Sequence, residues 1–232
     1  MTPSGNIATA SPCNRSKSTR HTLTRAVLCL WLVILGGCAT VDFDAPKSES
    51  RAFTDTADTR LGQALATEEE HPDNYSGFYL LSDAIDALAA RLLVANLAEK
   101  SIDAQYYLVK DDIIGRVFFA SLLQAADRGV RVRLLIDDVG TKGMDDLLAA
   151  VADHPNLELR LFNPFANRNT RAADAWDFQR LNRRMHNKSF TVDNQITVIG
   201  GRNIATEYFA ANSVYNFGDL DTLAIGPVVQ DT

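Results

Sequence analysis

A histidine and a lysine two residues apart, His186 and Lys188, have the chemistry that metal-free phosphoryl transfer requires. The imidazole can attack phosphorus as a nucleophile, and the ammonium can neutralise charge on the phosphate oxygens. Because alternate residues of a strand project to one face, a strand that begins here places both side chains together. Gly201 and Asn203 follow the next apolar run, where a helix start would direct free backbone N–H groups at an anion. The segment therefore predicts a phosphate site.

Asp193 extends the pair to a His-x-Lys-(x)4-Asp pattern, which is followed after six residues by Gly-Gly-x-Asn. The combined pattern resembles the motif of the phospholipase D superfamily. The stretches SIDAQYYL, RGVRVRLLIDD and FGDLDTLAIGPVV extend the resemblance over residues 75–230. Within the superfamily, the chain is similar to two-motif bacterial cardiolipin synthases, in particular their lipoprotein-like subgroup.

The resemblance implies an α/β fold, a phospholipase D-like layered domain with a mixed β-sheet flanked by helices, which is one half of a usual two-half enzyme. It implies that His186 attacks phosphorus or protonates the leaving alkoxide, and that Lys188 neutralises the non-bridging oxygens. Asn203 would donate to the phosphate. Gly201 belongs to the same phosphate-binding stretch, and many members have Ser there, so a hydroxyl contact is missing. The resemblance implies neither a metal nor another cofactor.

Carboxylates around the motif have two implied roles. The resemblance assigns Asp193 a mainly structural place in the motif, paired near the site. An acidic residue in the following strand usually orients the second nitrogen of the histidine, which fixes its tautomer and stabilises the imidazolium. Asp219 and Asp221 are two residues apart, so both can face the site. We expect Asp219 to have this role.

Only one copy of the motif is present. The other histidines (His21, His71 and His154) are not followed two residues later by Lys. Members of the superfamily use two motifs, one histidine as nucleophile and the other as general acid. The resemblance therefore implies a second half of the chain or a homodimer partner. We expect the N-terminal half of a longer enzyme, because the ending GPVVQDT resembles a continuing chain.

The elements that must position the motif alternate between strands and helices, which is typical of an α/β layered domain. Ser82 is the expected N-cap of the first helix, Gly129 ends the second, and Asn194 suits a turn between two short strands. We expect helices at 82–100, 114–128, 144–152 and 204–210, strands at 101–108, 130–136, 157–162, 189–192, 196–199 and 220–225, and mostly loop at 163–184.

The N-terminus is typical of an export signal. A basic stretch precedes the ten-residue apolar run 26–35, which is too short to span a bilayer comfortably. Leu35-Gly36-Gly37-Cys38 resembles the lipobox of bacterial lipoproteins, which implies that residues 1–38 contain the signal and that Cys38 is lipidated. An uncleaved anchor or an ordinary signal peptide is the alternative. Ala39, in place of Asp, favours the periplasmic face of the outer membrane. We expect residues 39–75 to be a flexible tether and 76–232 to be the domain.

The composition of the chain excludes some kinds of site and disfavours one class of partner. All three cysteines lie within the first 38 residues, so the body has no disulfide and no cysteine-based metal site. After Cys38 there are 19 basic and 29 acidic residues, a formal charge of −10, which argues against broad nucleic-acid binding.

Three functions are compatible with these observations. The first is a phosphatidyltransferase or phospholipase D-type enzyme that cleaves phospholipids through a phosphohistidine, including cardiolipin synthesis. The second is a single-motif homodimeric endonuclease. The third is an inactive half-domain that binds lipid or a partner. The sequence leaves open the head group, the acceptor, and hydrolysis versus transfer.

Overall fold

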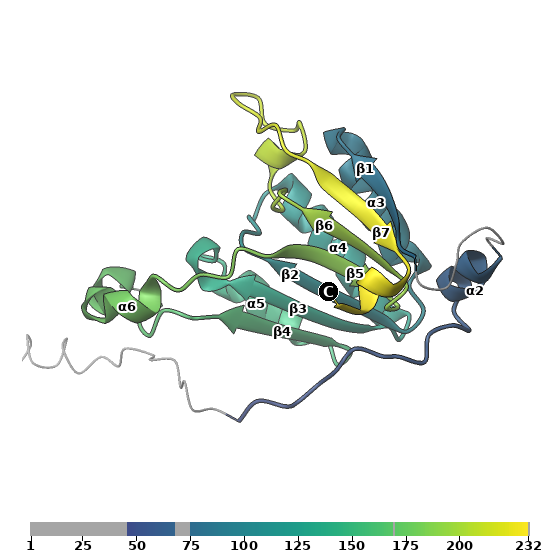
Figure 1. Ribbon diagram of the computed structural model, residues 1–232. Coiled ribbons are helices and arrows are strands. Elements are labelled where there is room, and N and C mark those ends of the chain that lie inside the picture. The colour runs from purple at the N-terminus through teal and green to yellow at the C-terminus, as the bar shows by residue number, and fades with distance from the viewer. Residues whose placement is uncertain (1–45, 68–74, 169, 232) are drawn as a thin grey trace, which may run out of the picture. The chain divides into compact units, whose positions relative to one another are not determined.

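The computed structural model describes residues 46–67, 75–168 and 170–231, which form one seven-stranded sheet with helices (Figure 1). The strand order is β1-β7-β6-β5-β2-β3-β4. Strands β2, β3 and β4 pair in parallel, whereas all other neighbouring strands pair antiparallel. The predicted mixed sheet is confirmed. The strands are β1 (Gly77–Leu81), β2 (Ser101–Tyr106), β3 (Arg131–Asp137), β4 (Leu157–Phe162), β5 (Lys188–Val192), β6 (Ile196–Gly200) and β7 (Asp221–Ile225).

Carboxylate caps define the two long helices. Asp83 accepts hydrogen bonds from backbone N–H groups of the first turn of α3, so Asp83 and not Ser82 is its N-cap. Asp112 caps α4 through the N–H of Gly115. Gly129 follows α4 with a φ of 92°, the left-handed conformation expected after a helix. The helical elements are α2 (Arg60–Ala66), α3 (Ala84–Leu97), α4 (Ile113–Asp127), η1 (Asp138–Gly140), α5 (Asp145–Ala152), η2 (Arg171–Asp177), α6 (Phe178–Leu181), η3 (Thr206–Tyr208) and η4 (Pro227–Asp231).

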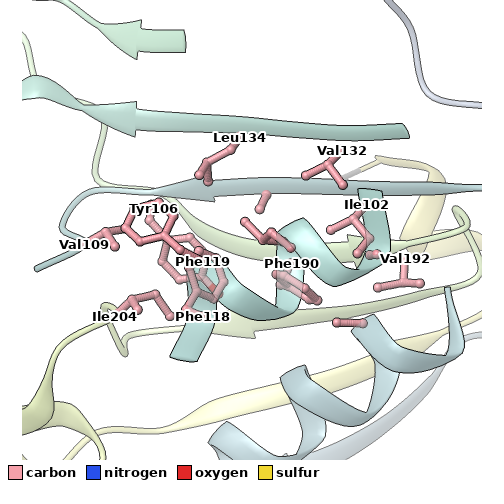
Figure 2. Close-up of a cluster of buried hydrophobic side chains, with 14 of the residues drawn as sticks. Ile102, Tyr106, Val109, Phe118, Phe119, Val132, Leu134, Phe190, Val192 and Ile204 are labelled. Carbon is pink, nitrogen blue, oxygen red and sulfur yellow. The ribbon is translucent and has the colours of Figure 1, made fainter. Parts of the chain in front are cut away.

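The core lies between α4 and one face of the sheet (Figure 2). Tyr106 of β2 and Phe190 of β5 are buried and both meet Phe118 of α4 edge-on, with ring centroids 5.3 and 5.9 Å apart respectively. Burying each such ring contributes about 1.5–3 kcal/mol. Because Tyr106 is the register partner of Lys188, this cluster fixes the strands that carry the motif.

An N-terminal strap, residues 48–58, lies on the charged face of the sheet. Its contacts are Ser48 with Arg160, Ser50 with Arg133, Arg51 and Phe53 with Arg131, and Asp55 and Asp58 with Lys100. The expectation of a solvated tether is therefore wrong for this part of 39–75, because the arginines of β3 and β4 bind the strap. The short helix expected near 59–66 is present as α2.

Three regions differ from the sequence prediction, and one of them is 163–184, which holds η2 and α6 where mostly loop was expected. Strand β1 was not predicted, because Phe78, Tyr79 and Leu80 are all exposed and the strand shows no alternation. The α-helix expected over 204–210 is wrong, since only the 3-10 turn η3 forms there. The N–H of Ile204 donates to the Leu108 carbonyl, which draws the chain along residues 108–110 instead of into a helix.

The N-terminal predictions fall outside the described part of the chain. These are the apolar run 26–35 and Cys38. In the ranges that the structure does describe, no helix is long and apolar enough to cross a bilayer.

Candidate functional site

His186 and Lys188 meet at one aromatic ring. The ring centroids of His186 and Tyr107 are 4.7 Å apart, and the Lys188 Nζ lies 5.2 Å from the Tyr107 centroid. Lys188 Nζ also donates to the His186 carbonyl at 2.9 Å. The sheet produces this arrangement, because Lys188 pairs with Tyr106 and the Tyr107 N–H donates to Asn187 at 3.0 Å. Both motif side chains thus approach the Tyr107 ring, but β5 begins at Lys188, so His186 lies outside the strand that was expected to carry both.

The Lys188 ammonium is buried with little compensation for its charge. The residue is 6% exposed, and within the described ranges no ion pair joins it to a carboxylate. Burial lowers the pKa of Lys188 below its usual 10.5, and the charge of Asp219 opposes this effect. An ammonium has three donors, of which one reaches the His186 carbonyl. The unbalanced positive charge of Lys188 would therefore stabilise an anion bound here.

A hydrogen bond to Leu108, the residue after Tyr107, connects Asn203 to the site. Its Oδ1 accepts from the Leu108 N–H at 3.1 Å, and its Nδ2 donates to the Tyr208 hydroxyl at 2.9 Å. Asn203 is 3% exposed, so these bonds hold the amide in one orientation. They leave its second amide hydrogen for a ligand.

The predicted row of free N–H groups after β6 is wrong. The Gly201 N–H donates to the Leu220 carbonyl at 3.1 Å, and the Arg202 N–H donates to Asp221 Oδ1 at 3.1 Å. The Ile204 N–H is also bonded, as described above. Pairing with residues 108 and 220 satisfies these donors, so this stretch does not form a helix start that binds an anion.

The two candidate carboxylates differ in their surroundings. Asp221 is fully buried against two arginines, with its Oδ2 2.9 Å from Arg91 and 3.5 Å from Arg202. Asp219 lies against Gly201, where a Cβ would come within 1.9 Å of its Oδ1. Asp219 is thus the carboxylate whose charge acts on Lys188. In the described part of the chain the His186 ring makes no hydrogen bond, so orientation of that ring by Asp219 stays a prediction.

Asp193 does not belong to the site. It follows the far end of β5, about 17 Å from the first residue at a strand rise of ~3.3 Å per residue. Its two oxygens accept from the N–H groups of Glu99, Lys100 and Ser101 at 3.0, 2.7 and 2.8 Å. The implied structural role fits these contacts, but the implied position near the site is wrong, because the carboxylate joins the hairpin to the start of β2.

Asp137 is a positioning residue that the sequence prediction missed. It ends β3, is fully buried and accepts from Arg184 Nη1 at 2.9 Å and from the Met185 N–H at 2.8 Å. These bonds fix the chain immediately before His186. The available signal was an acidic residue at the end of a buried strand. Tyr107 and Tyr208 were also missed, and no spacing marks them.

The described ranges contain no group of three or more histidine, cysteine, aspartate or glutamate side chains that could hold a metal.

Comparisons with known proteins add to this geometry. Residues 93–217, which include the motif from His186 to Asn203, match the family described as cardiolipin synthase, PLD-like domain. Cardiolipin synthase C of Escherichia coli (strain K12) is 53% identical over 174 residues, 74% of this chain and 37% of that protein. An uncharacterized protein of Helicobacter pylori (strain ATCC 700392 / 26695) is 38% identical over 202 residues, 86% of this chain and 40% of that protein. The chain thus spans about two fifths of the length of these relatives.

Solved structures show more distant similarity. NucT from Helicobacter pylori has a TM-score of 0.48 and 16% identity, covering 67% of this chain and 88% of that one. Nuc, a phospholipase D family member from Salmonella typhimurium, has a TM-score of 0.47 and 20% identity, covering 68% and 88%. Similarity at this level carries no functional conclusion.

Proposed function

The chain belongs to the cardiolipin synthase, PLD-like domain family, and on that premise we propose that it supplies one catalytic half of a phosphatidyltransferase or phospholipase D-type enzyme acting on phospholipids. The observation that carries the proposal is the buried Lys188 ammonium, which forms no ion pair with a carboxylate of the described residues, beside an exposed histidine. A phosphodiester is an anion that offers both a charge for the lysine and an electrophilic phosphorus for His186.

The proposed reaction has two displacements. A ring nitrogen of His186 attacks phosphorus, and the bond from phosphorus to the leaving alcohol oxygen breaks. Water or the hydroxyl of glycerol or of another phospholipid then attacks the phosphohistidine, and the phosphorus–nitrogen bond breaks. Attack by water gives phosphatidic acid, whereas attack by an alcohol gives transfer, including cardiolipin formation. Lys188 and the second amide hydrogen of Asn203 stabilise charge on the phosphate oxygens throughout.

A second motif completes the proposed site. An alkoxide is a poor leaving group, so its departure needs a proton from a positioned acid. While His186 attacks phosphorus, it cannot also protonate the oxygen that leaves on the opposite side. A second histidine, from another half or from a homodimer partner, would supply that proton. Lipidation of Cys38 at the periplasmic face of the outer membrane would hold the site near phospholipid.

The test is turnover of phosphatidylglycerol vesicles in EDTA, with the full chain alone and with a candidate half that carries a second motif. We expect released glycerol or transferred phosphatidyl group only in the second case, and not with His186→Ala. Lys142→Ala, an exposed lysine outside the motif, is the matched control for loss of a surface charge. Plasmid nicking without lipid turnover would identify a nuclease. No turnover of either substrate by a confirmed dimer or two-half complex would identify an inactive binding half.

A further inference from the structure

Two large side chains on the segment between β4 and β5 are strongly exposed. Trp176 is 94% exposed and Phe178 is 69% exposed. They lie on η2 and α6, which project beyond the ends of β3 and β4 (Figure 1). The segment is tied to the domain, since Arg168 pairs with Asp138 at 2.5 Å. Two large exposed aromatic side chains two residues apart form a candidate interaction surface.

The same segment is basic in an acidic protein. Residues 171–183 contain three arginines and two aspartates, a formal charge of +1, although the body carries −10. Arg171 pairs with Asp138 at 3.3 Å. Arg183 is exposed and, among the described residues, joins no ion pair. Arg180 pairs with Asp177 at 2.5 Å. Aromatic side chains beside arginines are typical of surfaces that enter the interface of an anionic bilayer.

The position of the segment relates it to the motif. It leads directly into His186, at the end of the sheet where β2, β3 and β4 end and β5 begins. The residues just before the strap reach the same end, because Pro46 and Lys47 line a surface cavity together with Asn163 and Pro164. Seven residues separate Pro46 from Cys38, so an acyl anchor on Cys38 would be at most about 28 Å along the chain from Pro46.

We propose that the segment 171–183 docks on the surface of a bilayer that contains anionic phospholipid. Trp176 and Phe178 enter the interface, and Arg183 contacts the phosphate head groups. Docking presents the end of the sheet that carries His186 and Lys188 to the lipid. The inference rests on the proposed function, since it supplies the surface through which a phospholipid-cleaving site reaches its substrate.

The test uses Trp176 as a fluorescent reporter. The chain has two tryptophans, Trp31 and Trp176, so a Trp31→Phe full chain leaves one. Vesicles of phosphatidylcholine with rising phosphatidylglycerol content and a doxyl-labelled lipid quencher are added. We expect a blue shift and quenching of Trp176 that increase with phosphatidylglycerol content and decrease with salt. Phe178→Ser should weaken the apparent affinity about tenfold, and Arg183→Glu about fivefold or more.

Leu93 on α3, which is 59% exposed, gives the matched control. A Leu93→Trp, Trp176→Phe, Trp31→Phe chain should show no quenching on the same vesicles. Unquenched Trp176 emission, with or without vesicle-bound protein, would overturn the proposal. A blue shift that depends on protein concentration in the absence of lipid would assign the patch to a second copy of the chain instead. Quenching of Trp176 without phosphatidylglycerol turnover would refute the proposed function and leave the docking surface in place.

Discussion

Replacing Lys188 with methionine should raise the stability of the fold while it removes activity. Burying an ammonium without a counter-ion costs several kcal/mol. The bond from Nζ to the His186 carbonyl returns about 1.5–3 kcal/mol, and the contact with the Tyr107 ring returns about 0.5–2 kcal/mol. A deficit on the order of 1 kcal/mol remains, and methionine fills a similar volume without the charge. We therefore expect Lys188→Met to be more stable by about 0.5–2 kcal/mol at pH 7.

The pH dependence of that gain follows from the pKa of Lys188. Burial lowers it, so the folded chain binds fewer protons than the unfolded chain between the folded pKa and the ordinary 10.5. Wild-type stability should therefore rise with pH across this window, and the advantage of the variant should shrink there. Urea unfolding at several pH values measures the difference.

Replacing a buried cation that is paired with a carboxylate should lower the stability of the fold instead of raising it. Arg91→Met removes a partner of the fully buried Asp221 and should destabilise the chain by about 3–5 kcal/mol. If Lys188→Met were destabilised by more than about 1 kcal/mol while the urea slope stayed unchanged, Lys188 would be a structural support and the reasoning about an unbalanced charge would be refuted.

The remaining predictions concern three other carboxyl and thiol positions. Asp193→Ala should lower the free energy of unfolding by about 2–4 kcal/mol in urea titrations and leave kcat of the folded enzyme unchanged, because three N–H groups lose their acceptor away from the site; a large loss of kcat would contradict this. Asp219→Asn should lower the pKa of Lys188 further, so that the alkaline limb of the pH–rate profile moves to lower pH; a shift to higher pH would exclude the electrostatic role. Cys38→Ser should accumulate as an unprocessed precursor without acyl label, and normal labelling would disprove lipidation at Cys38.

Local patterns predicted the elements around the motif well. The hairpin of β5 and β6 was predicted from two short apolar runs and Asn194, and both Asp193 and Asn194 have the positive φ of a tight turn, 49° and 50°. These predictions succeeded because they depend on interactions between residues that are close in sequence.

The failures depend on interactions between distant residues. The bonds of the Gly201 and Ile204 N–H groups to residues 220 and 108 could not be predicted, because nothing in residues 200–210 indicates which other strand or loop lies beside them. The prediction for the strap failed for a similar reason. Its polar composition is typical of a linker, and its own sequence does not indicate that the arginines of β3 and β4 bind it. Asp193 was placed near the site because it belongs to the motif, although β5 separates it from Lys188.

The central claim is that His186 becomes covalently attached to phosphorus during cleavage of a phospholipid. Single-turnover quenching with phosphatidylglycerol labelled with ³²P, followed by mass determination of the peptide that contains residues 186–188, tests this directly. With the second motif supplied, we predict an acid-labile, alkali-stable label on His186 that is lost in His186→Ala and reduced by about 10²–10³ in rate in Lys188→Met. Efficient turnover without a labelled His186, or a label that persists in His186→Ala, would contradict the account.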